Sequence, residues 1–269
     1  MKIVTLNFWG IEAPLDKRIA LAVRQLKALA PDVVCLQEVQ PFGKATTAHA
    51  IASQLGMHTE YGKACDWEDG AWGPGSKAGE QGLAILSRNE PTQSLITPLP
   101  EPRVGDARIL LSAVVGGIWV HTTHLHYRLD DGIAREQQVV AIDDVIRSNR
   151  TATSAPQILC GDFNATPDSD EIRFLRGLTT LAERRTHFQD AWMRMHGNAE
   201  GITWSSENEL TRPLRSLDID RRIDYIFVTS RKKDGRGTVR DCRVVLTERD
   251  DGICASDHYA VYADVQDRV

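Results

Sequence analysis

The chain has 269 residues, 42% of them hydrophobic and 26% charged, which is a globular composition and fits one large α/β domain or two modest ones. Its net charge is −5 and its isoelectric point lies near 5.9. This balance argues against a protein that holds nucleic acid mainly by counterion release, because that mode needs a basic face. A nuclease of this composition would depend on local basic residues and on metal ions.

The five cysteines are widely spaced and form no CxxC pair, so they indicate neither a disulfide framework nor a cysteine zinc site. No apolar stretch approaches the roughly 18 residues of a membrane span, and the opening residues combine no charged segment with a cleavage site. We therefore expect a cytoplasmic protein without a membrane span, with export by a signal-less route left open. We also expect a monomer.

The first third of the chain alternates strand and helix patterns. Short apolar runs indicate strands, and apolar side chains at helical spacing indicate helices. A threonine can cap a helix N-terminus, and a stretch rich in glycine and tryptophan cannot hold a regular element for long. The expected elements are a strand at 2–7, a helix at 15–30, a strand at 33–39, a helix from Thr46 or Thr47 to Gly56, and a surface loop at 62–79.

Strand pairs mixed with helices fill the rest of the chain, which predicts two sheets packed together with helices outside. Gly116 and Gly117 predict a hairpin, because both accept positive φ. The helix after this hairpin has its buried face marked by Ile133, Val139 or Val140, Ile142 and Ile146. The other expected elements are strands at 82–87, 108–115, 118–125, 157–161, 222–229 and 239–246, a helix at 168–175, a polar loop at 210–220, and a last strand after His258.

Polar residues stand at or beside the ends of the expected strands. Strand ends form the crevice where ligands bind in open α/β architectures, so these side chains are expected to converge. Taken singly, Glu38 is explained equally well as a solvated carboxylate, a lone Asn after a strand is most often a turn former, an Asx turn also explains GDFN, and a lone Asp-His pair is common by chance. The residues are Asn7 in TLNFWG, Glu38 in VVCLQEV, His124 in HTTHLHY, Asp162 and Asn164 in GDFN, Asp224 in RRIDYIFV, and Asp257 and His258 in ASDHYAV.

The ordered series LN, LQEV, THL, GDFN, RIDYI and SDH resembles the motif set of the endonuclease/exonuclease/phosphatase superfamily. That superfamily includes DNase I-like nucleases, apurinic endonucleases, deadenylases, neutral sphingomyelinases and inositol-phosphate phosphatases. Each motif alone is weak, but six in order over residues 7–258 are strong. The resemblance implies one catalytic domain over residues 1–269, with an α/β fold: a four-layer α/β/β/α sandwich of two mixed, largely antiparallel sheets with outer helices.

The resemblance also implies hydrolysis of a phosphate ester with Mg²⁺ or Mn²⁺. Glu38 would bind the metal, Asn7 would help to place the ion or its waters, and Asp257 would add negative charge on the same side. Oxygen ligands of this kind suit Mg²⁺, which prefers carboxylates and waters to a closed protein cage.

The remaining motif residues would act on the phosphate. His258 would bind it or act as a general base, and Asp224 would orient the His258 ring. Asp162 would position or deprotonate the attacking water, while Asn164 and His124 would stabilise the phosphoryl oxygens as charge builds on them.

Two further residues are candidates for substrate contact. Arg108, in ARILL, resembles an arginine that contacts a substrate phosphate in DNase-like relatives, although an arginine on an edge strand explains it as well. Trp204, in GITWSSENELTR, resembles a loop on the substrate side in tyrosyl-DNA phosphodiesterases and deadenylases. Relatives often place a Glu before the strand 82–87, where it supports the first His. Both Glu80 and Gln81 precede that strand here, so the support of His124 stays open.

Several functions remain open. A nuclease acting on DNA or RNA is the first expectation, with tryptophans of the segment 62–79 available to stack on bases. The acidic isoelectric point favours instead a compact substrate such as a phospholipid headgroup or an inositol phosphate. A non-catalytic binding module is a third reading. A binuclear zinc hydrolase is suggested by His124 and His126, two apart on one strand, but the Asp-His that should follow is missing.

Overall fold

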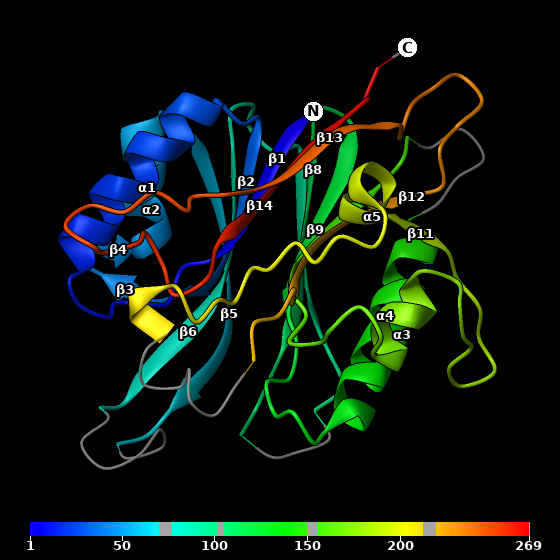
Figure 1. The fold of residues 1–269 in the computed structure, drawn as a ribbon, viewed down its shortest axis with the longest axis horizontal. Helices are drawn as coiled ribbons and strands as arrows, with labels where there is room; N and C mark the ends of the chain where they lie inside the picture. Colours follow the sequence, from blue (N-terminus) through cyan, green and yellow to red (C-terminus); the bar gives the residue numbers. More distant parts are fainter. Residues whose placement is uncertain (70–76, 102–104, 150–154, 212–218, 269) are drawn as a thin grey trace.

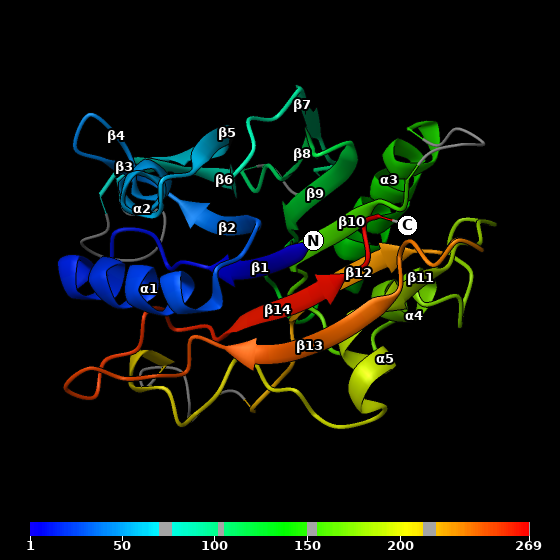
Figure 2. The same ribbon diagram turned by 90° about the horizontal axis from the view of Figure 1, so that it is seen from above.

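The computed structural model describes residues 1–69, 77–101, 105–149, 155–211 and 219–268. Two six-stranded sheets pack face to face, and helices cover the outer face of each (Figure 1). Figure 2 shows the same layers from above. This arrangement is the four-layer sandwich that the motif series implied. In the described part of the chain, no helix has both the length and the apolar composition to cross a bilayer.

The first sheet contains both ends of the described chain. Its strands are β1 (Lys2–Asn7), β2 (Val33–Val39), β5 (His58–Trp67), β6 (Gly79–Ser87), β13 (Val239–Val245) and β14 (Ala260–Val265), in the order β13-β14-β1-β2-β6-β5. β1 and β2 run parallel, and the other neighbours pair antiparallel. Helices α1 (Leu15–Leu29) and α2 (Thr47–Leu55) cover its outer face, and a small hairpin of β3 (Pro41–Phe42) and β4 (Ala45–Thr46) precedes α2.

The second sheet is built from the middle of the chain. Its strands are β7 (Gln93–Pro98), β8 (Ile109–Val115), β9 (Ile118–His124), β10 (Ile158–Asp162), β11 (Phe188–Asp190) and β12 (Asp224–Thr229), in the order β11-β12-β10-β9-β8-β7. Only β9 and β10 pair in parallel among the described strand pairs of this sheet. The remaining helices are α3 (Gly132–Ser148) and α4 (Asp170–Leu175) on its outer face, α5 (Ala191–His196), and a 3₁₀ turn at Glu209–Thr211.

The central strands are apolar on both faces because each sheet lies between the other sheet and a helix layer. In β1 and β2, Ile3 and Val33 belong to the core between the sheets, whereas Val4 and Val34 belong to the core under α1 and α2. Strands buried in this way have near-continuous apolar sequences rather than strict alternation. The runs at 2–7 and 33–39 therefore predicted strands with the observed bounds.

Two local signals of the sequence are confirmed. The side chain of Thr46 accepts a hydrogen bond from the backbone N–H of His49 at the start of α2, and Gly56 ends that helix with a φ of 65°. The turn between β8 and β9 places Gly116 and Gly117 at φ values of 58° and 81°. Both glycines lie in the left-handed region that other residues avoid.

The surface loop predicted over 62–79 is wrong at both ends. β5 extends to Trp67 and β6 begins at Gly79, and these two residues pair across the ladder. The composition gave the wrong prediction because strand pairing uses backbone groups, which glycine also provides. Gly82 allows β5 and β6 to approach closely, since a Cβ on Gly82 would lie 2.1 Å from the carbonyl oxygen of Gly62. Trp67 packs over Gly79 and donates to the carbonyl of Lys77, and Trp72 lies outside the described residues.

The predicted buried face of the third helix is wrong at one position. Val139, Ile142 and Ile146 are buried in α3, but Ile133 is 66% exposed. Ile133 precedes Ile142 by nine residues, which is about two and a half helical turns and therefore the opposite face. Ala134 occupies the buried position in the first turn instead.

The sequence did not predict the short or polar elements. β7 is mostly exposed at the edge of its sheet, β11 has three residues, and α5 has six, so none carries a clear apolar period. The strand predicted at 222–229 begins at Asp224, because Arg222 turns to bind Asp190 through three hydrogen bonds of 2.9–3.0 Å. Most of the polar loop predicted at 210–220 lies outside the described residues.

The buried His121 in β9 makes folding sensitive to acid. Its Nδ1 faces Ser112 Oγ at 2.7 Å and its Nε2 faces Gln157 Oε1 at 2.9 Å, which suits a neutral ring. Burial lowers the pKa of His121 from its usual 6.5 to about 4. The unfolded chain therefore binds this proton more readily than the folded protein, and the stability given by the neutral ring is full above pH 6.5 and is lost as the pH falls toward 4.

We expect the free energy of unfolding of the wild type, relative to that of His121→Leu, to fall by on the order of 3 kcal/mol between pH 6.5 and pH 4. Chemical denaturation at a series of pH values measures this difference. If the free energies of unfolding of the two proteins change in parallel with pH over that range, His121 is not the titrating group.

Candidate active site

Three predicted polar residues lie in one row across the second sheet. His124 ends β9, Asp162 ends β10 and Asp224 begins β12, and the register pairs Asp162 with both of the others. Neighbouring strands lie about 4.8 Å apart, so the register alone brings these side chains together. Gly161 permits this close pairing, because its φ is 141° and a Cβ there would lie 1.9 Å from the carbonyl oxygen of Thr123.

Two more residues come from the first sheet. Asn7 ends β1, and Glu38 lies next to the last residue of β2 with a φ of 54°. The pairing of β2 with β6 shifts register between Leu36 and Val39, so Glu38 lies in a β-bulge. A bulge re-aims a side chain that regular pleating would direct elsewhere, and a positive φ at a non-glycine residue persists only where surrounding contacts enforce it.

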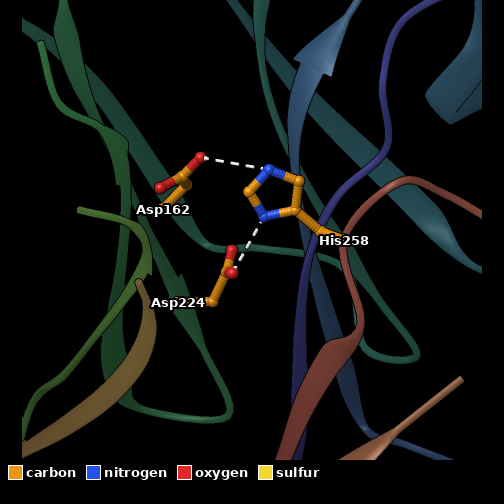
Figure 3. A group of neighbouring side chains, drawn as sticks. All are labelled: Asp162, Asp224 and His258. Carbon is orange, nitrogen blue, oxygen red and sulfur yellow. Dashed lines mark hydrogen bonds and ion pairs between the residues drawn. The ribbon is translucent and has the colours of Figure 1, made fainter. Parts of the chain in front are cut away.

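The segment before β14 supplies Asp257 and His258. Ser256 holds it against β1, because its Oγ donates to the carbonyl oxygen of Asn7 at 2.6 Å. Asn208 holds it from the other side, because its Nδ2 donates to the carbonyl oxygens of Ser256 and Asp257 at 2.8 and 2.9 Å. His258 Nδ1 then bonds to Asp224 Oδ2 at 2.9 Å, while its Nε2 lies 3.8 Å from Asp162 Oδ2 (Figure 3).

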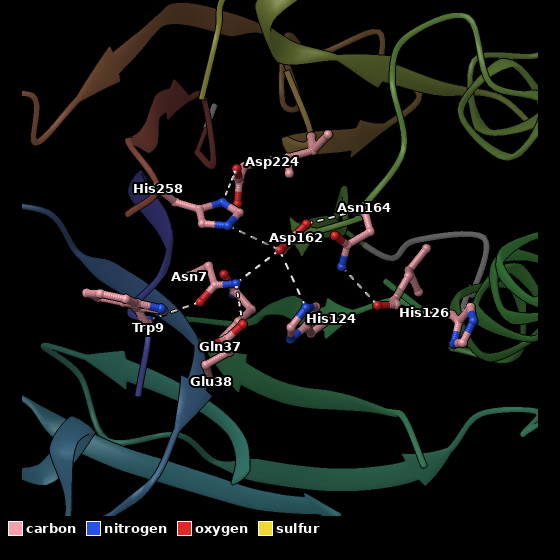
Figure 4. Close-up of polar contacts among 12 residues, drawn as sticks. Asn7, Trp9, Gln37, Glu38, His124, His126, Asp162, Asn164, Asp224 and His258 are labelled. Carbon is pink, nitrogen blue, oxygen red and sulfur yellow. Dashed lines mark hydrogen bonds and ion pairs between the residues drawn. The ribbon is translucent and has the colours of Figure 1, made fainter. Parts of the chain in front are cut away.

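Asp162 is the centre of the site, as Figure 4 shows. Its Oδ2 accepts a hydrogen bond from Asn7 Nδ2 at 3.0 Å, and the Nε2 atoms of His124 and His258 lie 3.5 and 3.8 Å from that same oxygen. Asn7 Nδ2 also donates to Glu38 Oε1 at 3.0 Å, so one amide joins the carboxylates of the two sheets. The sequence predicted this convergence from strand ends alone.

Burial and mutual repulsion perturb the carboxylates. Burial, together with the charge of Asp224, raises the pKa of Asp162 to about 6. Burial, together with the charge of Glu38, raises the pKa of Asp257 to about 7. Perturbed carboxyl groups of this kind gather at functional sites, where acids and bases must work near neutral pH.

The two imidazoles are driven to opposite charge states. Burial opposes a charge on His258, but Asp224 and Asp162 outweigh it and raise the pKa of His258 to about 10. Burial and the positive charges of Arg108 and His258 lower the pKa of His124 well below its usual value. Near neutral pH the site therefore holds one imidazolium and one neutral imidazole on either side of Asp162.

Asn164 is placed beside these groups by a local turn. Its backbone N–H donates to Asp162 Oδ1 at 2.8 Å, its φ is 49°, and its Nδ2 donates to the carbonyl oxygen of Leu125 at 3.1 Å. GDFN is therefore both a turn and part of the site. One hydrogen of the amide is used by Leu125, which fixes the orientation of the side chain.

The two candidate substrate residues both reach the site. Trp204 packs edge-on against the His258 ring, with centroids 5.0 Å apart. Arg108 precedes β8 and lines a small cavity together with His124 and Gln81. Arg108 is not an edge-strand residue, because β8 lies between β7 and β9 and the side chain is only 4% exposed.

Glu80 does not contact His124. It accepts a hydrogen bond from Tyr61 Oη at 3.3 Å and pairs with Lys63, both on β5. Gln81 Nε2 lies 3.7 Å from Cys65 Sγ. His124 is instead placed by its register in β9 and by its contact with Asp162.

The zinc alternative has no geometric support. His124 faces Asp162, whereas His126 lies beyond the end of β9 and its Nδ1 bonds to Asp106. The two imidazoles therefore belong to different groups of side chains.

Sequence reasoning missed the residues that hold the motif segments. Thr203 is fully buried, and its Oγ1 accepts the backbone N–H groups of Ile223 and Asp224 at 3.1 and 3.3 Å. Arg18, also fully buried, donates to the carbonyl oxygens of Phe8 and Ala255 from helix α1. A threonine in a polar loop and an arginine in an amphipathic helix give no sequence signal for such roles.

The fold is shared by solved structures of low sequence identity. An endonuclease/exonuclease/phosphatase from Beutenbergia cavernae DSM 12333 superposes with a TM-score of 0.73 at 24% identity, covering 99% of this chain and 71% of that one. D. rerio TDP2 complexed with single strand DNA product gives 0.72 at 20% identity, covering 98% and 97%. These likenesses define a DNase I-like sandwich.

A model of the Endonuclease/Exonuclease/phosphatase family matches residues 4–258. The chain belongs to this family, whose members are phosphoesterase hydrolases. Protein angel homolog 2 of Bos taurus is 26% identical over 161 residues, which are 57% of this chain and 30% of that protein. The chain thus matches about a third of the length of this curated relative.

Divalent metals are general in this family, and the donor atoms at the site fit such an ion. Within the described residues, one group of three possible ligands has its atoms within 4.8 Å of one another, namely Asp162, Asp224 and His258. Asp224 Oδ1 is buried there without a hydrogen-bond partner in the described chain. The charge of His258 opposes a cation on that ring. Glu38 and Asp257 offer two further carboxylates, and the charge of Glu38 contributes to the raised pKa of Asp257.

Replacing Asp224 tests the origin of the charge on His258. We expect Asp224→Asn to lower the pKa of His258 from about 10, because the largest stabilising charge is lost while burial remains. NMR titration of the histidine Cε1–H resonances in metal-free protein measures the shift. His121 serves as an internal control in the same spectra, since its ring does not contact Asp224. An unchanged His258 titration would contradict the pairing.

Proposed function

We propose that this chain is a metal-dependent phosphodiesterase that hydrolyses nucleic acid, acting as one domain over residues 1–269. The observation that carries the proposal is the buried Asp162 between a charged His258 and a neutral His124, with Asn7 joined to the same oxygen. A phosphodiester is anionic, so its hydrolysis needs positive charge for its oxygens and a base for water. The site offers both.

The charge state of each residue determines its proposed role. The His258 imidazolium, held by Asp224, neutralises a phosphoryl oxygen. Asp162 takes a proton from the attacking water, and its pKa of about 6 leaves it ionised at neutral pH yet basic enough to act. Asn164 and the neutral ring of His124 donate hydrogen bonds to the phosphoryl oxygens as negative charge builds on them.

Glu38, Asn7 and Asp257 would hold Mg²⁺ or Mn²⁺. The ion would supply Lewis-acid neutralisation of phosphate charge. Of the three residues, Glu38 is the only one in the bulge of β2, and Asn7 fixes its carboxylate through the 3.0 Å bond to Oε1. We propose that this bulge exists to present a carboxylate to the metal.

Support for a nucleic-acid substrate comes from the relatives and from the rim of the site. The D. rerio TDP2 structure is a complex with single strand DNA product. In this chain, Trp204 stands beside His258 and Arg108 beside His124, so an aromatic ring and a guanidinium flank the proposed phosphate position. Stacking and phosphate contact are how proteins hold single strands.

A compact phosphate ester, such as a phospholipid headgroup or an inositol phosphate, is the second candidate. The net charge of −5 favours it, because an acidic protein repels a long polyanion.

An activity panel with Mn²⁺ separates these functions. We expect hydrolysis of single-stranded DNA, RNA and bis(p-nitrophenyl) phosphate, with His258→Ala and Asp162→Ala each reducing the rate about a hundredfold to ten-thousandfold. The exposed His58 gives a matched control, since His58→Ala removes an imidazole far from the cluster. Turnover of sphingomyelin or inositol phosphates with no nuclease activity would favour the second candidate. No turnover of any ester would leave only the binding module.

Metal binding has a readout that does not depend on activity. We expect Mg²⁺ or Mn²⁺ at millimolar concentration to raise the melting temperature by a few degrees, because the ion relieves repulsion between Glu38 and Asp257 and binds only the folded chain. Differential scanning fluorimetry measures the shift.

Glu38→Gln should abolish that metal-dependent shift and should melt slightly higher than the wild type without metal, since one repelling charge is gone. The exposed Glu90 provides the control, and Glu90→Gln should keep the full shift. An equal shift in all three proteins would place the metal elsewhere.

A further inference from the structure

His126 is a buried imidazole that the proposed chemistry does not use. It lies just beyond β9 and is 2% exposed, and Figure 4 shows its ring turned away from the cluster around Asp162. Its Nδ1 bonds to Asp106 Oδ2, and its Nε2 lies 3.4 Å from Asp131 Oδ2. A ring set between two carboxylates needs a reason beyond filling space, because an apolar side chain would fill the same volume without a polar cost.

Asp106 connects His126 to Arg108. Arg108 Nε and Nη2 donate to Asp106 Oδ1 at 3.0 and 2.6 Å, while His126 occupies Oδ2. The two oxygens of one carboxylate are thus held from opposite sides, by a guanidinium and by an imidazole. Arg108 uses Nε and Nη2 of its guanidinium for Asp106, so its Nη1 takes no part in this ion pair.

Arg108 lines the cavity that His124 also lines, between the two sheets at the edge of the site. The cavity has a volume of about 10 Å³, which is room for a single water-sized group. An oxygen of a phosphoryl group has that size, whereas a sugar or a base is far too large. Arginine is suited to such an oxygen because its charge is permanent and its donors are rigid.

The His126 ring is itself fixed by the backbone around it. The N–H of His126 donates to Gln138 Oε1 at 3.0 Å, and Arg135 Nη1 donates to its carbonyl oxygen at 3.4 Å. Gln138 and Arg135 belong to α3, which packs on the second sheet. A rigid helix therefore determines where Nδ1 points, and Nδ1 determines where Asp106 lies.

We propose that His126 is a positioning residue that acts through Asp106 to hold Arg108 in the cavity beside His124, where Arg108 binds one oxygen of the substrate phosphate. The proposal rests on the proposed function for the identity of the substrate. It adds His126 and Asp106, which form no part of the strand-end cluster, to the set of residues on which phosphate affinity depends.

Four single variants, and the double variant Arg108→Ala/His126→Leu, test this coupling. Arg108→Ala removes the phosphate contact, and His126→Leu removes the donor to Asp106 while keeping a side chain of similar bulk. His126→Asn restores an N–H donor close to the position of Nδ1. The control is His121→Leu, which replaces a fully buried histidine of β9 whose ring bonds to Ser112 and Gln157 and not to Asp106.

Two measurements apply to each variant: equilibrium binding of inorganic phosphate with Mg²⁺ by calorimetry, and steady-state kinetics on bis(p-nitrophenyl) phosphate with Mn²⁺. We expect Arg108→Ala to weaken phosphate binding and lower kcat/KM by about tenfold to a hundredfold. His126→Leu should reproduce most of that loss, and the double variant should be no worse than Arg108→Ala alone, because both act on one contact. His126→Asn should recover most of the affinity, and His121→Leu should match the wild type.

Wild-type affinity in His126→Leu, losses that multiply in the double variant, or no recovery in His126→Asn would each overturn the proposal. If His126→Leu does not fold, Asp106→Asn weakens the same link from its other end and should show the same non-additive loss with Arg108→Ala. A wild type that binds phosphate but hydrolyses no ester would refute the proposed function and leave the coupling measurable. A wild type that does not bind phosphate would refute the subsite.

Discussion

The bond between Asn7 and Asp162 joins the two sheets at the point where the site forms. Asn7 Nδ2 spans from β1 to β10 and touches a carboxylate on each side, Glu38 and Asp162. Both carboxyl groups are removed from bulk water to different degrees, and a neutral amide is the group that can lie between them without adding charge. The face-to-face packing of the sheets therefore sets the distance between the metal side and the phosphoryl side of the site.

The local backbone is adapted to this requirement at several positions. Glu38 and Asn164 both adopt positive φ, and Gly161 allows β10 to approach β9 more closely than any side chain would permit. Such conformations cost free energy and are retained where the surrounding fold enforces them. They lie at the ends of two strands, β2 of the first sheet and β10 of the second, which concentrates the cost where the chemistry is proposed.

Charge balance explains why the site keeps an imidazolium. Burial alone would neutralise His258, but two aspartates face its two nitrogens and reverse that tendency. His124, on the other side of Asp162, is buried and lies near the positive charges of Arg108 and His258, so its pKa moves the other way. Two histidines of the same chain thus differ in charge because of their neighbours and not because of their sequence context.

The sequence by itself determined the order of the motifs, the layers of the fold and the identity of the residues that converge, because buried strands and their polar ends leave a readable pattern. It did not reveal the bulge that redirects Glu38, or that Thr203 and Arg18 bond to the backbone of the motif segments. It also did not reveal that Ile133 lies on the exposed face of its helix. Only the tertiary structure decided these, because each depends on contacts between residues far apart in the chain. The same reason separates His124 from His126: two positions apart in sequence, they face different carboxylates once the strand ends between them.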